Sequence, residues 1–338
     1  PGNTKGRNTH LSALLKAPYG TEAVRLWAVA WASGKVPDEA IEIWTRGFVK
    51  PLSKKSGDGV RPITMFETLL KVATGLALDV SKQTIIQAVG EYQYGALLSS
   101  GADKMVYNLR SLAAARPDHV FIATDIKNAF GAVLRHKALK ALLSFAPHLA
   151  PIMSLFWKQA HTPLLLPRTL DSLALLSVTQ GVFQGECLST AVFCIFLRAV
   201  IDKFYENLTH INLPSNPNAT PRELITILAY VDDVVISCDP TLLPQIWPIW
   251  ISTLAEHGLQ VEPSKCKAWV PNATALDPDI ESHVPMVLNG LPVLGTAAQS
   301  DHSCLITLPS CTASTDTLLA DANKRLVNAQ KDAALLQQ

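Results

Sequence analysis

The chain has 338 residues, of which 48% are hydrophobic and 17% charged, with a net charge of +1 and a pI of about 8.0. This composition is typical of a folded globular protein and excludes a disordered one, and the length allows two or three subdomains. A net charge so close to zero does not by itself indicate nucleic-acid binding, so a basic groove would require local clustering. The longest apolar stretch, residues 191–201, contains Arg198 and is too short to span a membrane.

The six cysteines show no C-x-x-C spacing and no dense framework. This pattern predicts reduced thiols and an intracellular protein, not a secreted one. No signal peptide is visible. The chain begins at Pro1 and ends inside a helical pattern, so we expect it to be part of a longer protein.

Residues 11–36 are predicted to be helical, with Trp27 and Trp31 one turn apart in the core. Glycines at positions 90 and 258 are expected to end two later helices. The mixture of helices and strands lacks regular βαβ alternation, so we predict an α+β fold. The other expected elements are a strand at 48–52, a loop at 53–59, helices at 66–89 and 101–115, a strand at 120–124, helices at 131–145 and 186–204, a hairpin at 225–236, a helix at 243–257, a strand at 261–270, a turn or strand at 291–295, and a helix from 317 onward.

Two adjacent carboxylates, Asp232 and Asp233, interrupt an apolar run that is otherwise suited to burial. Two like charges about 4 Å apart repel by about 4 kcal/mol at an effective dielectric constant near 20. Either the pair lies in a solvent-exposed hairpin turn, where aspartate is common, or a divalent cation offsets the repulsion. The run alone leaves both interpretations open.

A third acid, Asp125, ends the apolar strand predicted at 120–124. An aspartate before a helix is often an N-cap, so Asp125 is a candidate either for a cap or for a metal ligand. We expect it to join the Asp232–Asp233 pair in one site.

Several motifs surround these acids in a fixed order. Asp125 is followed by Asn128-Ala129-Phe130, and Tyr230-Val231 precedes the acidic pair. The chain thereby resembles reverse transcriptases, and among them the polymerases of non-LTR retrotransposons. The other segments that carry the resemblance are Lys54 with Gly59-Val60-Arg61-Pro62-Ile63, Gln184-Gly185-Glu186-Cys187-Leu188-Ser189, Gly258-Leu259 with Pro263-Ser264-Lys265-Cys266, and Leu294-Gly295.

The resemblance implies primer-dependent synthesis of DNA on an RNA template by two-metal nucleotidyl transfer. Asp125, Asp232 and Asp233 would hold two Mg²⁺ ions, with Mn²⁺ as the alternative ion. The implied partners are an RNA template, a DNA primer and deoxynucleoside triphosphates, with no membrane; the oligomeric state does not follow from the sequence. The nucleus is one compartment that such an enzyme would use.

The resemblance also implies roles for further side chains. Lys54 and Arg61 would grip the nucleotide phosphates, although Lys54 also fits a solvated loop. Lys265 would donate a proton to the leaving pyrophosphate, or it is a surface lysine. Phe130 would lie under the sugar and exclude a 2′-hydroxyl, or it packs in the core. The remaining substrate contacts would come from Gln184, Gly185 and Tyr230.

The implied architecture is a right-hand polymerase fold. We expect an N-terminal helical extension at 1–45, fingers at 46–119, a palm at 120–300 with finger elements around 150–180, and the start of a thumb at 301–338.

The motif of residues 184–190 departs from the family pattern, because Glu186, Cys187 and Thr190 replace an aspartate and two prolines. Glu186 is expected to keep the charge. The rival enzyme is an RNA-dependent RNA polymerase, against which Phe130 argues, or an intron maturase, for which no added RNA-binding domain is visible. A third alternative is a decayed or domesticated polymerase fold that only binds nucleic acid. An unrelated metal-dependent hydrolase would need further ligands that the sequence does not show.

Overall fold

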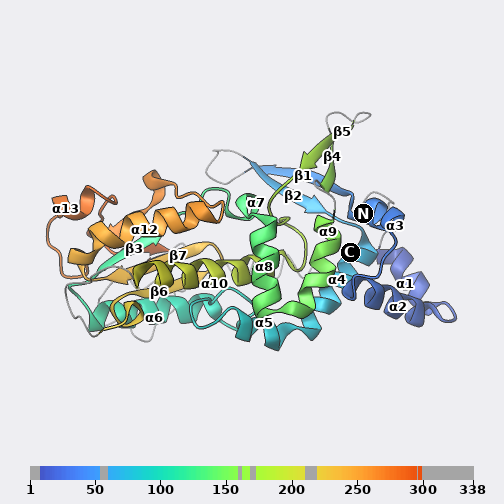
Figure 1. Ribbon diagram of the computed structural model, residues 1–338, viewed down its shortest axis with the longest axis horizontal. Helices are drawn as coiled ribbons and strands as arrows, with labels where there is room; N and C mark the ends of the chain where they lie inside the picture. The colour runs from blue at the N-terminus through green and yellow to red at the C-terminus, as the bar shows by residue number, and fades with distance from the viewer. Residues whose placement is uncertain are drawn as a thin grey trace, which may run out of the picture.

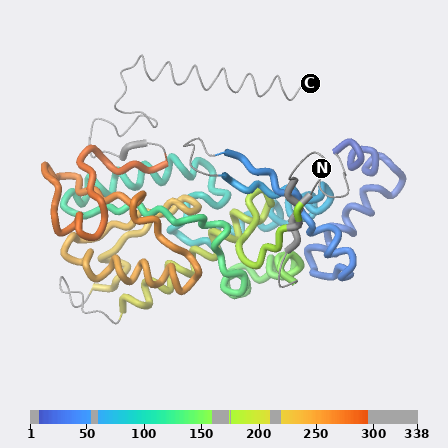
Figure 2. The backbone as a smooth tube through the Cα atoms, turned by 90° about the horizontal axis from the view of Figure 1, so that it is seen from above, coloured from blue at the N-terminus to red at the C-terminus, as the bar shows by residue number. Residues whose placement is uncertain are grey.

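The computed structural model describes residues 8–53, 60–158, 162–167, 173–209, 219–294 and 296–298. Lys54, most of the loop around it, Gly295 and the expected thumb at 301–338 lie outside the described residues. The molecule is elongated, with the N-terminal helices at one end and the strands that carry the acidic residues toward the other (Figures 1 and 2). None of the helices within the described ranges is long and apolar enough to cross a membrane.

The helices mostly match the apolar periodicity, with extra breaks. The region expected as one helix at 11–36 is two, because Tyr19 adopts a positive φ of 61° between them. The region at 66–89 is likewise divided at Ser81. The helices are α1 (Asn8–Lys16), α2 (Gly20–Ala32), α3 (Asp38–Thr45), α4 (Thr68–Val80), α5 (Lys82–Ala88), α6 (Gly101–Ala115), α7 (Ala129–Ala132), α8 (Arg135–Phe145), α9 (Ala150–Trp157), α10 (Ser189–Leu208), α11 (Pro221–Leu224), α12 (Leu243–Glu256) and α13 (Pro278–Glu281), with 3₁₀ turns η1 (Pro147–Leu149), η2 (Pro240–Leu242) and η3 (Pro263–Lys265).

The described strands form three sheets. One has the order β2-β1-β4-β5, the second β6-β7-β3-β8, and β9 pairs with β10. The strand expected at 261–270 is shorter, since η3 takes its first part. The strands are β1 (Gly47–Ser53), β2 (Val60–Met65), β3 (Val120–Thr124), β4 (Thr162–Pro167), β5 (Leu173–Val178), β6 (Thr226–Tyr230), β7 (Asp233–Cys238), β8 (Lys267–Trp269), β9 (Leu291–Val293) and β10 (Thr296–Ala298).

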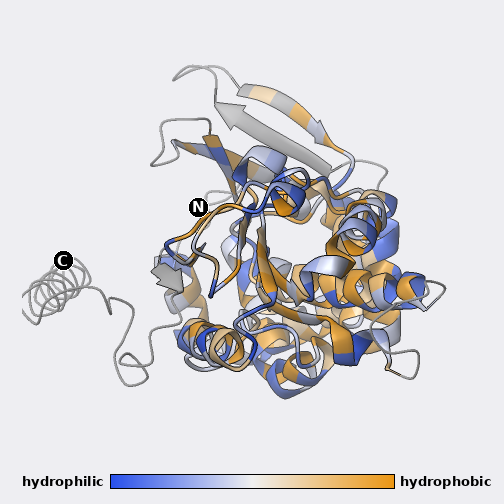
Figure 3. Cartoon of the chain, turned by 90° about the vertical axis from the view of Figure 1, so that its left-hand side faces the viewer, coloured by the Kyte–Doolittle hydropathy of each residue, from blue (hydrophilic) through white to orange (hydrophobic). Residues whose placement is uncertain are grey.

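The sheet β6-β7-β3-β8 is antiparallel throughout and is covered on both faces. Alternate residues of β3 show this: Val120 and Ile122 belong to the main core cluster, whereas Phe121 belongs to a second cluster with Met105 and Leu109 of α6. Because neither face meets water, these strands are nearly continuous apolar runs instead of alternating ones. Apolar segments gather toward the inside of the molecule around this sheet (Figure 3).

Helix α10 is the centre of the main core, since thirteen of its twenty residues are buried. It packs against α8 and α12. Trp31 in α2 is fully buried and Trp27 is partly buried, as the one-turn spacing predicts. The combination of helices with mainly antiparallel sheets confirms the α+β class.

Candidate active site

The pairing of β3 with β7 brings Asp125 to the acidic pair. Thr124 at the end of β3 lies opposite Val234 in β7, so the next residue, Asp125, comes opposite Asp233. Directly opposed residues in antiparallel strands have Cα atoms about 5 Å apart. Asp232 lies in the short turn that joins β6 to β7, beside Asp233. Acids more than a hundred residues apart in sequence therefore meet at one end of one sheet.

The electrostatics of this end reflect the closeness of the acids. Partial burial and the charges of Asp232 and Asp125 raise the pKa of Asp233 to about 6. Burial, followed by the charge of Asp125, also raises the pKa of Asp232, and the positive charge of Arg61 partly opposes this. The cluster thus disfavours its own negative charge and would be stabilised by a cation.

Arg61 approaches from the other large sheet. It is exposed on β2, opposite Leu52 of β1, and its charge acts on Asp232. Two sheets therefore contribute to one region, with carboxylates from the first and a guanidinium from the second. Lys54, the other predicted phosphate ligand, lies outside the described residues.

The cap interpretation of Asp125 is wrong. The N-cap of α7 is Asn128. Asp125 instead contacts the segment before β8: its amide donates to Cys266 Sγ at 3.4 Å, and its carbonyl accepts from the Glu262 amide at 2.9 Å. Lys265 is exposed on η3 within this same segment, and its role stays a prediction.

The Gln184–Gly185 turn lies against β2. The Thr64 amide donates to the Gln184 carbonyl at 2.7 Å. Gly185 has a φ of +101°, and a Cβ there would lie 2.6 Å from the Thr64 carbonyl oxygen, so this approach requires glycine. The turn therefore joins the β2 side of the molecule to the start of α10.

Phe130 packs against the main core, as one of its two predicted roles requires. Its ring is stacked on Phe193 of α10, with centroids 4.9 Å apart and planes 10° apart, and it remains partly exposed. Its carbonyl accepts from the Val182 amide, which ties it to the loop that leads to Gln184. Tyr230 is partly buried against the second core cluster and pairs with Asp233.

Glu186, which was expected to keep the charge of the aspartate that it replaces, lies inside the protein. The side chain is buried, and burial raises its pKa to about 7. Its Oε2 accepts from the Leu188 amide at 2.8 Å and the Ser189 hydroxyl at 3.2 Å. Glu186 thus holds the start of α10 from inside the protein.

The acids fit a divalent cation in chemistry, since hard cations prefer carboxylate oxygens. Within the ranges that the structure describes, no group of three or more His, Cys, Asp or Glu side chains is arranged to hold a metal ion. Asp125, Asp232 and Asp233 are therefore candidates to bind a cation together with ligands from outside the chain.

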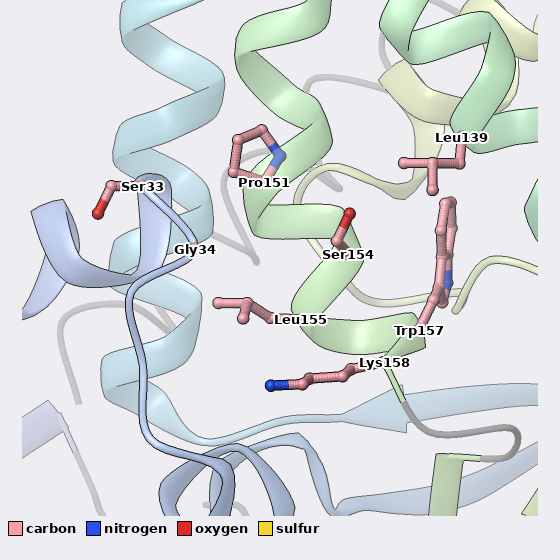
Figure 4. A pocket seen from close by; sticks show the side chains of 8 residues that line it. All are labelled: Ser33, Gly34, Leu139, Pro151, Ser154, Leu155, Trp157 and Lys158. Carbon is pink, nitrogen blue, oxygen red and sulfur yellow. The ribbon is translucent and has the colours of Figure 1, made fainter.

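Two hollows on the surface contain none of these acids. One, of about 500 Å³, lies between the α2–α3 connection and α9 (Figure 4), where Lys158 also pairs with Asp38. The other, of about 400 Å³, lies between Tyr94 and residues of α6 that include Tyr107. Neither contains the residues that the sequence motifs single out.

One contact of the acidic turn was missed by sequence reasoning. The side chain of Gln93 bonds to the backbone of Val231, directly before Asp232. A lone glutamine between two tyrosines carries no pattern that points to a residue 138 positions away.

Comparison with known proteins supports the fold. A telomerase structure from Candida tropicalis, truncated of its C-terminal domain, superimposes with a TM-score of 0.54 at 15% identity over 76% of this chain and 54% of that one. Telomerase from Candida albicans, solved with a fragment of telomeric RNA, gives a TM-score of 0.51 at 15% identity over 76% of this chain and 48% of that one. The chain thus spans about half the length of these proteins. The similarity confirms the α+β right-hand polymerase fold.

No curated protein sequence matches the chain. The family model described as reverse transcriptase (RNA-dependent DNA polymerase) matches residues 53–299, which contain every acid of the candidate site. The chain therefore belongs to the reverse transcriptase family.

Proposed function

We propose that this chain synthesises DNA from a primer on an RNA template. The observation that carries the proposal is the register of β3 and β7, which sets Asp125 opposite Asp233 with Asp232 in the adjoining turn. Family membership supports nucleotidyl transfer at a coarser level. The specific residues and substrates are our proposal.

Asp125, Asp232 and Asp233 would hold two divalent ions, with Mg²⁺ as the expected ion and Mn²⁺ as the alternative. Such ions, when bound, make the primer hydroxyl more acidic and neutralise charge on the leaving pyrophosphate. The raised pKa values of Asp232 and Asp233 support this role, because a neighbouring cation would favour their ionised forms.

The chain's other groups would bind and orient the substrates. Arg61 would grip the triphosphate, since its guanidinium already acts on Asp232 and offers a bidentate fork; Lys54 remains a prediction for the same task. Lys265 would donate a proton to the departing pyrophosphate. Gln184, Gly185 and Tyr230 would contact the nucleotide, template or primer end.

Phe130 would select the sugar. Its ring is held by Phe193 in a fixed orientation and is still partly exposed, so it can both pack and block a 2′-hydroxyl. Deoxynucleotides are therefore the proposed substrates. Contacts to the nucleic acids would be mostly to phosphates and hence sensitive to salt.

We further propose that the chain is the polymerase part of a non-LTR retrotransposon protein. Telomerase is the alternative kind of reverse transcriptase, because telomerase structures share the fold. An intracellular, nuclear place of action follows from either proposal.

A non-catalytic nucleic-acid-binding module is the second candidate function. It is favoured by the altered motif at Glu186 and Cys187, in which Glu186 is buried. As such a binding module, the chain would bind a primer–template duplex in a salt-dependent way but would add no nucleotide.

Primer extension separates the two candidates. We expect the purified protein to extend a DNA primer on an RNA template with Mg²⁺ and deoxynucleotides, and Asp232→Asn to be at least about 1000-fold slower because a metal ligand is lost. Circular dichroism and thermal melting should show that the variant stays folded. Extension by Asp232→Asn at the wild-type rate would refute the proposal, and duplex binding without any extension by wild type would favour the binding module.

A further inference from the structure

The turn that carries Asp232 contains a strained residue. Val231 joins β6 to Asp232 and has a φ of 56°, in the left-handed region. A β-branched side chain is unfavourable in this conformation and adopts it only where its surroundings impose it. The turn therefore needs support from outside its own hairpin.

Gln93 provides that support with its side-chain amide. Its Oε1 accepts from the Val231 amide at 2.7 Å and from the Gly95 amide at 2.8 Å. Its Nε2 donates to the Val231 carbonyl at 3.2 Å. Gln93 is only 6% exposed, so these bonds lie away from competing water. Both the N–H and the C=O of Val231 are thus held by one side chain.

The segment around Gln93 is itself fixed against β6. The Ala229 amide donates to the Tyr92 carbonyl and the Tyr94 amide donates to the Ala229 carbonyl, both at 2.7 Å. A Cβ at Gly95 would lie 2.6 Å from both Cγ2 and N of Val231, so glycine is needed for this approach. Backbone hydrogen bonds on both sides of Gln93 therefore fix its position relative to β6.

We propose that Gln93 is a positioning residue: it imposes the left-handed conformation on Val231 and thereby directs the carboxylates of Asp232 and Asp233 toward Asp125. This inference rests on the proposed function, in which those carboxylates hold divalent ions. All three bonds are made within the chain, so they would hold the turn without any bond to metal or nucleotide, which would lower the cost of assembling the site.

Gln93→Met tests the proposal, since methionine has a similar length but cannot make these hydrogen bonds. We expect the amides of Val231 and Gly95 to exchange hydrogen about tenfold to 100-fold faster, while the amides of β3 keep their protection. Affinity for Mn²⁺ alone, measured by electron paramagnetic resonance, should fall about tenfold to 100-fold. The rate constant of nucleotide addition should fall by a similar factor with little change in KM. Gln83→Met, on the exposed surface of α5, is the matched control and should change none of these.

Relief of the backbone strain should remove the need for Gln93. In a Val231→Gly background, where a positive φ is unstrained, Gln93→Met should lower Mn²⁺ affinity by less than about threefold. An equal loss in both backgrounds would mean that Gln93 supports the fold in general and would overturn the proposal. Gln93→Asn, which keeps the amide but is one methylene shorter, should reproduce the exchange and Mn²⁺ effects if Gln93→Met does not fold.

The outcomes separate this inference from the proposed function. The protein could bind Mn²⁺ in a way that depends on Gln93 and yet extend no primer. That result would leave the positioning role intact and refute the polymerase proposal. Wild-type Mn²⁺ affinity and wild-type amide exchange in both Gln93 variants would overturn the positioning role, whatever the activity. A wild-type protein that binds no Mn²⁺ at all would overturn both.

Discussion

The two large sheets of this protein are built in opposite ways. In β7, five of six residues are buried, and in β3 four of five are buried with the fifth partly exposed. In β1 the last four residues are exposed, and in β2 the first three are. The candidate carboxylates are thus held by a sheet enclosed in the core, whereas Arg61 projects from a sheet whose far part stands in solvent. In the proposed function, the buried sheet would hold the carboxylates in place. The exposed sheet that carries Arg61 would be free to shift as it binds the nucleotide phosphates.

Prolines strengthen this contrast. Pro51 of β1 lies opposite Pro62 of β2, and neither can donate a ladder hydrogen bond. β4 pairs with β1 at Gly47 and Phe48, so the described part of the ribbon beyond these residues has two strands. A two-stranded ribbon is marginally stable without further packing. The Arg61 side of the site is therefore expected to be the mobile one.

The largest expected effect is a difference in stability between the two sheets. Ile122→Ala in β3 removes a side chain that is 1% exposed and should lower the free energy of unfolding by about 2–5 kcal/mol. Leu52→Ala in β1 removes one that is 44% exposed and should cost less than about 0.5 kcal/mol. Urea denaturation measures both. Equal costs would show that the two sheets are packed alike.

A smaller effect concerns pH and the buried acid at the start of α10. The pKa of Glu186 is about 7 in the folded protein and about 4.5 when unfolded. Glu186 therefore stays protonated up to a higher pH in the folded state than in the unfolded state. The free energy of unfolding should decrease as pH rises from about 4.5 to about 7. Glu186→Gln should remove this part of the slope and stabilise the protein by roughly 1–3 kcal/mol above pH about 7.

Denaturation at several pH values checks this. Asp233, whose folded pKa is about 6, adds a slope of the same sign at lower pH in both proteins, so the difference between wild type and Glu186→Gln isolates Glu186. A difference that is the same at every pH would mean that Glu186 does not titrate in this range.

The smallest effect should come from the exposed sheet. Arg61→Ala should raise KM for the incoming nucleotide about tenfold through the loss of a phosphate contact, with a smaller change in kcat. Arg25→Ala, an exposed arginine of α2 that pairs with Glu22, is the control. A change confined to kcat would mean that Arg61 acts in the chemical step and not in nucleotide binding. The exposed sheet would then not be a separate phosphate-binding part of the site.

Much of the enclosed sheet could be predicted from the sequence. The apolar run at 120–124 matches β3, and the run around Asp232 and Asp233 matches the β6–β7 hairpin. Strands buried on both faces leave a strong local signal because nearly every position is apolar. No local pattern in the sequence indicates that β3 and β7 are neighbours. The meeting of Asp125 with Asp232 and Asp233 was expected from the resemblance to reverse transcriptases.

The exposed sheet was harder to predict. Strands β4 and β5 were not assigned; two prolines in β4 argue locally against a strand there. The break at Ser81 has neither proline nor glycine to mark it, so no local pattern predicted it. Gln93 could not be found because its task depends on contact with Val231, far away in the sequence.

In the proposed function, Asp125 and the Asp232–Asp233 pair bind the same divalent ions, and this can be measured as metal affinity. Titration with Mn²⁺, followed by electron paramagnetic resonance, would compare wild type with Asp125→Asn and Asp232→Asn, with the exposed Asp79→Asn of α4 as control. We expect both site variants to lose affinity by at least about tenfold and the control to match wild type. Wild-type Mn²⁺ affinity in Asp125→Asn, with a loss of affinity in Asp232→Asn alone, would mean that Asp125 does not share an ion with the acidic pair.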